Sequence, residues 1–426
     1  MSPIRARATV AGTAFAAALV LAVPGPAAAA PAPGPEGGPR AAVAPTVEEA
    51  RLSLAVPQEI LRRSGFAPVA PEFGRALQRA GSYGQARRVV DRHASELWER
   101  AVDRAQGRGP ALGDLSRDDD RPLYWARLGM TRELRQWQPS FPLTGERRAA
   151  LLAGLERSSR GQDSMDFPER GRGDGHRGKA LKRVVVTGFD PFTLDRDIRI
   201  SNPSGATALA LDGTVIRTAG GPAVVQAAVF PVRWQDFADG TVERTLRERL
   251  PEADLFTTVS QGRPGRFDIE RHNGAWRGGF PDNENVSRTE TVPVADPATQ
   301  PQWTRSTLPV AAITAAPTGR FPVLDNTSVQ EIPAGGSTPV VSPGGPTPGS
   351  VARQGGGGNY LSNEIAYRAT LLRDRLGLDT PGGHVHTPVL EFGAGNTTEI
   401  TDPAFLKNRQ DIVGQVREII EVAAGA

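Results

Sequence analysis

The chain has 426 residues, enough for two or three domains, and a formal net charge of +3 at neutral pH. It contains no cysteine, which excludes disulfides, thiolate metal sites and a cysteine nucleophile. Arginine is strongly favoured over lysine, but no basic run is interleaved with aromatic residues and no zinc-finger or basic-zipper spacing occurs. We therefore expect no nucleic-acid partner.

The N-terminus has the parts of a secretory signal peptide. Arg5 and Arg7 precede an apolar stretch at 10–23, and prolines and alanines follow. This stretch is too short to span a bilayer comfortably, and we place cleavage after Ala29. Residues 1–29 are thus predicted to be a leader, and the mature protein to be secreted without membrane association. An uncleaved membrane anchor is the alternative.

Two segments of biased composition divide the rest of the chain. Residues 30–45 are rich in Pro, Ala and Gly, and residues 158–180 are polar and rich in Gly and Arg. Neither holds enough apolar side chains to form a core, so both are predicted to be linkers. The stretch between them, 46–157, is predicted to be a small all-α module, and no catalytic constellation is evident in it.

The helices of this module are predicted from the spacing of its apolar residues. Thr46 and Glu49 have the spacing of a capping box, and the run that follows is expected to break at Pro57. Apolar residues recur along one side of 85–106, with charged residues opposite them. Two further helices are expected, at 122–137 and 146–156.

From residue 181 onward, apolar runs alternate with helical periods. The alternation predicts an α/β domain at 181–426, with an open, twisted and largely parallel sheet flanked by helices. Residues 325–358, rich in Gly, Pro and Ser, are expected to be a flexible insertion without regular structure, either a flap or a disordered segment. Strands are expected at 184–186, 223–232 and 254–259, and helices at 206–211, 234–250 and 403–423.

A serine and a histidine have the setting of a nucleophile and its base. Ser362 lies at the start of a predicted helix, where free N–H groups favour developing negative charge. His386 lies in a short β-like run that follows this helix. The two could act together in catalysis. Taken singly, however, serine is a common helix cap, and a histidine is more often packed or on the surface.

The α/β region carries a series of short motifs in a fixed order. In that order they resemble the pyroglutamyl peptidase I family (pyrrolidone-carboxylate peptidases), cysteine peptidases that remove an N-terminal pyroglutamate. The resemblance extends over residues 183–423. Its motifs are TGFDPF at 187–192, NPS at 202–204, VSQ at 259–261, IER at 269–271, PDN at 281–283, STLP at 306–309, the stretch around Ser362, and GHVHTP at 383–388.

The resemblance implies a triad of Glu270, Ser362 and His386, in which serine stands where the family has cysteine. A thiol is readily held as thiolate beside an imidazolium, but a hydroxyl is not. His386 would therefore have to take the proton as attack occurs, while Glu270 orients the imidazole.

The resemblance also implies a pocket for the lactam ring of pyroglutamate. Phe189 and Phe192 would form its apolar wall, Tyr360 and Leu361 would add to this wall, and Gln261 would lie near the polar edge of the ring. For the two phenylalanines, ordinary core packing is the alternative.

The sequence departs from the family at two more positions. The family's arginine before its Pro-Asp-Asn is replaced by Gly279, with Arg277 nearest to it, and the residue after Ser362 and its asparagine is Glu364. Because one oxyanion donor can be worth about 2.7–4 kcal/mol, loss of that arginine is expected to slow the reaction.

His384 and His386 share a strand face and could bind a metal. No cysteine and no obvious carboxylate pair accompanies them, so we expect neither a metal nor another cofactor.

Three functions are consistent with these residues. The leading prediction is a secreted hydrolase that removes N-terminal pyroglutamate from peptides through Ser362. The second is a catalytically inactive homologue that binds pyroglutamyl peptides. The third is a serine hydrolase that acts on another amide or acyl substrate. The sequence does not indicate an oligomeric state.

Overall fold

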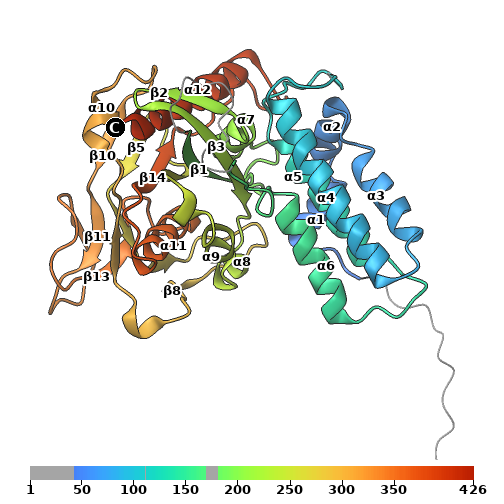
Figure 1. Cartoon of the computed structure of the whole chain (residues 1–426), viewed down its shortest axis with the longest axis horizontal. Coiled ribbons are helices and arrows are strands. Elements are labelled where there is room, and N and C mark those ends of the chain that lie inside the picture. Colours follow the sequence, from blue (N-terminus) through green and yellow to red (C-terminus); the bar gives the residue numbers. More distant parts are fainter. Residues whose placement is uncertain (1–42, 111, 169–180) are drawn as a thin grey trace, which may run out of the picture. The chain divides into compact units, whose positions relative to one another are not determined.

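A sheet of mixed direction lies at the centre of the second half of the chain (Figure 1). The structure is a computed structural model and describes residues 43–110, 112–168 and 181–426. The predicted leader and most of the linker at 30–45 lie outside these residues, as do residues 169–180 of the second predicted linker.

The first part of the described chain is helical, as predicted. Thr46 caps the first helix in a capping box with Glu49. Pro57 was expected to end a helix, but it lies in the first turn of one, where its missing N–H is tolerated, and the break falls at the extended residue Leu54. The helix at Val69–Gln78 was not predicted from the sequence. The helices are α1 (Val47–Ala50), α2 (Ala55–Ser64), α3 (Val69–Gln78), α4 (Tyr83–Ala105), α5 (Arg121–Gln136) and α6 (Gly145–Ser158), with a 3-10 turn, η1 (Arg51–Ser53), after α1.

The segment that follows α6 is packed, in contrast to the linker predicted from its polarity. Ser159, Arg160 and Met165 are buried. The carbonyl of Arg160 accepts a hydrogen bond from Val229 N at 2.9 Å, and Gln162 Nε2 donates to Val229 O at 2.9 Å. Helices α1–α6 and this turn, through Met165, are called the helical module below.

Seven strands of the described chain form the main sheet, in the order β10-β5-β14-β4-β1-β3-β2. The four strands β3, β1, β4 and β14 run parallel, while β2 and β5 are antiparallel to their inner neighbours. The prediction of a largely parallel sheet is therefore confirmed. The strands are β1 (Lys182–Phe189), β2 (Val215–Thr218), β3 (Gly221–Phe230), β4 (Leu255–Gln261), β5 (Phe267–Glu270), β10 (Val323–Asn326) and β14 (Gly382–Thr387).

Helices cover both faces of this sheet because its strands carry apolar residues on both sides. Val184 and Val186 of β1 face α7 (Pro203–Leu211) and α12 (Pro403–Gly425), in an apolar core that continues into the helical module. Val185 faces the opposite way and packs in a second apolar cluster with residues of α8 (Trp234–Ala238), α9 (Thr241–Leu246) and α11 (Leu361–Arg375). These three helices lie on the same side of the sheet (Figure 1).

The helix predicted at 234–250 is interrupted. Gly240 separates α8 from α9 with a φ of 77°, a left-handed conformation that glycine adopts readily, and the 3-10 turn η2 (Leu250–Glu252) follows. The smaller elements are β6 (His272–Gly274), β7 (Trp276–Gly278), β8 (Thr289–Thr291), η3 (Pro297–Thr299), β9 (Trp303–Arg305) and α10 (Val310–Ala315).

The segment at 325–358 has regular structure, contrary to the prediction. Its start belongs to β10, and β11 (Val329–Ile332) then pairs antiparallel with β12 (Val340–Ser342) and β13 (Val351–Gln354). The buried carboxylate of Glu331 accepts from Ser342 Oγ at 2.5 Å and from Thr347 N at 2.7 Å. Its mobility stays a prediction. Among the described helices, none combines the length and apolarity needed to cross a membrane.

Candidate active site

A cavity of about 300 Å³ opens where β1 and β4 end and α11 begins. Seven of the eight predicted site residues line it, and the eighth, Glu270, lies behind His386. Carboxyl ends of parallel strands are the usual ligand sites of such sheets. The lining residues are Phe189, Phe192, Asn202, Val232, Ser260, Gln261, Gly262, Arg263, Gly356, Gly357, Gly358, Tyr360, Leu361, Ser362 and His386.

His386 is oriented by a buried carboxylate. Because β14 pairs with β5, His386 Nδ1 lies 2.7 Å from Oε1 of Glu270, which is fully buried. The other carboxylate oxygen accepts from Asn326 Nδ2 at 2.7 Å. This fixes the imidazole with Nδ1 toward Glu270, and no hydrogen bond from the described residues reaches Nε2. That nitrogen is available to take a proton at the cavity wall.

Ser362 is the second residue of α11, as the sequence predicts. Its hydroxyl donates to the carbonyl of Gly357 at 3.1 Å, and within the described chain no hydrogen bond joins it to His386. Of the two expected steps of the triad, the structure forms the one between His386 and Glu270.

Two glycines allow close packing around His386, Glu270 and the start of α11. A Cβ on Gly357 would lie 3.0 Å from His386 Cε1 and 3.5 Å from Asn363 Cα, so this glycine separates the imidazole from the start of α11. A Cβ on Gly356 would lie 2.1 Å from Glu270 Oε2. The glycine run is therefore a close-packing requirement of the site.

The start of α11 is held in place by Asn363. Its side-chain oxygen accepts from Gly274 N at 2.9 Å and its amide donates to Gly274 O at 2.8 Å, which ties the helix to β6. Among the described residues no side chain caps α11. Its first-turn N–H groups have no partner within the helix and can stabilise negative charge at Ser362.

The predicted pocket residues form a largely aromatic wall. Phe189 is buried and stacks at 6.1 Å on Phe237, while Phe192 is half-buried with its ring 6.2 Å from that of Tyr360. Tyr360 donates its hydroxyl to Pro281 O at 3.0 Å, and burial raises its pKa, so the phenol stays neutral. Gln261 accepts from Leu390 N at 3.1 Å through its side-chain oxygen.

Of the two remaining departures from the family pattern, Glu364 pairs with Arg277, the arginine nearest to Gly279. Arg277 Nε and Nη2 lie 2.7 and 2.6 Å from the carboxylate of Glu364, and both side chains are buried. The guanidinium also stacks over Trp234, with 5.1 Å to the ring centroid. Arg277 is thus engaged beneath the site, and it is not among the residues that line the cavity.

Sequence reasoning did not single out several residues of the cavity. Arg263 lines it and pairs with buried Asp268 at 2.9 Å. Asn202 and Ser260 line it as well, and both stand in motifs quoted above, so their position at strand or helix ends was the available signal.

His384 does not join the triad. Its Nδ1 lies 2.7 Å from Thr258 Oγ1 and its Nε2 lies 2.8 Å from Ser260 Oγ, so both ring nitrogens are engaged with hydroxyls. Burial lowers the pKa of His384 well below its usual value, and nearby His386 adds to this. His384 is therefore a neutral core histidine beside the site.

Comparison with known proteins gives related sequences over most of the chain. A family model described as the PA0049 N-terminal domain matches residues 27–156, and one described as the PA0049 C-terminal domain matches residues 183–297 and 321–391. A Pseudomonas aeruginosa protein, whose printed name is "Uncharacterized protein PA0049", is 34% identical over 468 residues. The match covers 85% of this chain and 83% of the relative.

Solved peptidase structures resemble a little over half of the chain. A mutant pyrrolidone carboxyl peptidase from Pyrococcus furiosus is 24% identical with a TM-score of 0.39, over 57% of this chain and 97% of that one. Pyroglutamyl peptidase I from Bacillus amyloliquefaciens is 20% identical with a TM-score of 0.40, over 57% and 98%. At TM-scores this low the likeness carries no weight for function, which depends on the geometry of the cavity.

Proposed function

The chain belongs to the PA0049 family, and from this premise we propose that it is a hydrolase that removes N-terminal pyroglutamate from peptides. Ser362 acts as the nucleophile and His386 as the general base, and Glu270 positions the imidazole. The observation that carries the proposal is the 2.7 Å contact between His386 Nδ1 and buried Glu270, at a cavity wall that Ser362 shares.

Each group has a defined part in the reaction. The Ser362 hydroxyl turns from Gly357 O to His386 Nε2, which removes its proton as the oxygen attacks the pyroglutamyl carbonyl. The first-turn N–H groups of α11 stabilise the oxyanion that forms. His386 then gives the proton to the departing amine, and the C–N bond breaks. Water, deprotonated by His386, releases pyroglutamate from the serine ester.

The aromatic wall supports a small, nearly flat and neutral acyl group as the substrate. Phe189, Phe192 and Tyr360 line the cavity, and we place the lactam ring against them. We assign the side-chain NH₂ group of Gln261 to the polar edge of the ring. The side-chain oxygen already accepts from Leu390 N, which leaves the NH₂ group to donate to the substrate.

The second candidate is a homologue that binds pyroglutamyl peptides without cleaving them. The hydrogen bond from Ser362 to Gly357 O favours this candidate, as does the engagement of Arg277 by Glu364. A third candidate, a serine hydrolase acting on another acyl or amide group, shares the triad and differs only in the fit of the pocket.

One assay separates these candidates. A fluorogenic pyroglutamyl amide should be cleaved slowly by the wild type, and Ser362→Ala should abolish turnover without abolishing binding. Ser362→Cys should raise the rate, because a thiol can be ionised beside His386 before attack. Saturable binding without turnover in the wild type would favour the binder. Labelling of Ser362 by a serine-directed phosphonate, without a pyroglutamyl preference, would favour the third candidate.

We also propose that the protein is secreted and acts outside the cell, from its N-terminal sequence. N-terminal sequencing of the culture supernatant should find a chain that begins near Ala30. A membrane-bound form that retains Met1 would contradict this.

A further inference from the structure

We propose that the helical module completes the substrate pocket, because its buried charged residues hold the two loops that support the aromatic wall. These are the 190–195 loop, which follows β1, and the 281–286 loop. The identity of the ligand rests on the proposed function, but the positioning role does not.

The first contact holds the 190–195 loop. Asp190 lies between the two cavity residues Phe189 and Phe192, and it is 2% exposed. Its carboxylate accepts from Arg160 Nε at 3.0 Å and Nη2 at 2.8 Å, and its other oxygen accepts from Arg127 of α5. Both arginines are buried and belong to the helical module. The wall residue Phe192 is thus two residues away from a carboxylate fixed by that module.

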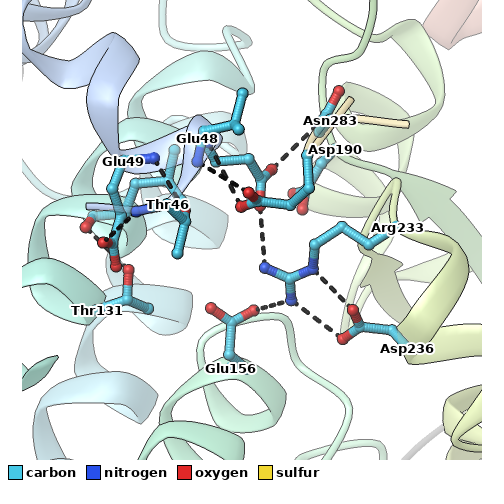
Figure 2. A network of polar contacts seen from close by, with 12 residues as sticks. Thr46, Glu48, Glu49, Thr131, Glu156, Asp190, Arg233, Asp236 and Asn283 are labelled. Atoms are coloured by element: carbon cyan, nitrogen blue, oxygen red, sulfur yellow. Dashed lines mark hydrogen bonds and ion pairs between the residues drawn. The ribbon is translucent and has the colours of Figure 1, made fainter. Parts of the chain in front are cut away.

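The second contact links the two loops to each other and to α1. Asn283 Nδ2 donates to Pro191 O at 2.9 Å and lies 3.2 Å from Glu48 Oε1 (Figure 2). Tyr124 of α5 donates to the same Glu48 oxygen at 2.8 Å. Arg51 donates to Asn283 O at 2.6 Å. The helical module therefore holds both the side chain and the main chain of Asn283.

The third contact joins the start of α8 to the helical module. Arg233 lies 3.0 Å from Glu48 and 2.7 Å from Glu156, and it pairs with Asp236 on its own side (Figure 2). It follows directly on Val232, which lines the cavity. Glu48 therefore takes part in both the second and the third contact. Burial raises the pKa of its carboxyl group.

The holding residues act through the residues they support. Asp190, Asn283 and Glu48 are not among the cavity-lining residues, so they are positioning residues rather than catalytic ones. The carboxylates of Asp190 and Glu48 are both buried, and each has an arginine partner from the other side of the contact. Removal of one partner leaves an uncompensated buried charge, which favours rearrangement of the loop that carries it.

The test uses the full chain and three charge-removing variants. Asp190→Asn and Glu48→Gln should each raise KM for a pyroglutamyl amide by about tenfold while kcat changes by less than about threefold, because the pocket is altered and the triad is not. Asp118→Asn is the matched control. It removes a carboxylate that pairs with Arg409 at 2.8 Å, again between the helical module and α12, and Asp118 neither lines the cavity nor contacts the two loops through its carboxylate.

A purely structural role would lower the unfolding temperature of all three variants and leave KM unchanged, which would overturn the proposal. If Asp190→Asn does not fold, Glu48→Gln carries the test, because it keeps the shape of the side chain and an acceptor for Tyr124.

A second measurement is independent of the substrate. The chain has no cysteine, so Phe192→Cys introduces a single thiol on the 190–195 loop. The rate at which a maleimide labels this thiol should rise about tenfold when Asp190→Asn or Glu48→Gln is added. Either substitution should make local opening of the loop about tenfold more frequent, and the thiol is labelled in the open form. Asp118→Asn should not change this rate. Equal rates in all four proteins would overturn the positioning role, whereas failure to bind or cleave any pyroglutamyl compound would overturn only the proposed function.

Discussion

Glu364 lies fully buried between two guanidinium groups. Arg277 approaches it at 2.6 Å and Arg368 at 2.8 Å. We expect Glu364→Leu to lower the free energy of unfolding by about 3–5 kcal/mol, because it leaves two buried cations without their shared partner. Urea unfolding measures this change.

Glu290→Gln is the matched control for this prediction. Glu290 pairs with the same Arg277 at 2.9 Å, but its side chain is 46% exposed. Its removal should change the free energy of unfolding by less than about 1 kcal/mol. Equal losses in the two variants would mean that the buried contacts of Glu364 contribute no more than a surface pair.

His384 should make stability depend on pH. Burial lowers its pKa in the folded protein, so the unfolded chain binds a proton below about pH 6.5 that the folded chain does not. His384 therefore contributes to the free energy of unfolding at pH values above the pKa of the unfolded chain. This contribution is lost as the pH falls below that value, by up to about 1.4 kcal/mol per pH unit. His384→Asn should flatten this part of the profile between pH 5 and 7, measured by urea unfolding. His93 and His272, whose pKa values burial also lowers, stay in the variant and retain part of the slope. An unchanged slope would exclude His384 as its source.

At the residue scale, the sequence predicts which side chains gather but not how they are paired. The motif order brought Ser362, His386 and Glu270 to one site. The hydroxyl of Ser362 turned to Gly357 O instead of the imidazole, and no spacing rule predicts that choice. The sequence also gives no sign that Glu364 pairs with Arg277, because the two residues lie 87 positions apart in the chain.

At the element scale, strand β10 brings a residue of the predicted insertion to Glu270 of the proposed triad. Asn326 donates to Glu270 Oε2 at 2.7 Å. We expect Asn326→Leu to lower kcat/KM by about tenfold, because a buried carboxylate oxygen that loses its donor no longer fixes the imidazole. The adjacent Thr327→Val, which removes a hydroxyl bonded to Pro343 O, is the control. Similar kinetics for both variants would exclude a role of β10 in positioning Glu270.

The elements that sequence patterns missed share a physical reason. The insertion has few large apolar residues, and its small sheet forms around the buried carboxylate of Glu331, which has no periodic signal. The helix expected at 234–250 broke because Gly240 takes a left-handed conformation, which periodicity does not register. Long runs with a clear period, such as α4, α5 and α12, were predicted to within a few residues.

At the scale of the whole molecule, we expect the helical module and the α/β part to unfold together. One apolar core extends from the helical module to the face of the sheet under α7 and α12. Buried ion pairs join the two parts, between Arg127 and Asp190 and between Arg409 and Asp119. Residues 43–426 also form one compact unit. The shared core implies that a fragment of residues 181–426 would expose apolar surface.

Hydrogen exchange at increasing urea concentration measures this coupling without any substitution. Amides of α5 report on the helical module and amides of β4 report on the sheet, and both should reach the same free energy of opening if the parts unfold as one. Asp190→Asn should then lower the opening free energy of both elements by the same amount, although the substituted residue lies in neither. A decrease confined to β4, or two different limiting values in the wild type, would mean that the halves unfold separately and that the contact at Asp190 is only local.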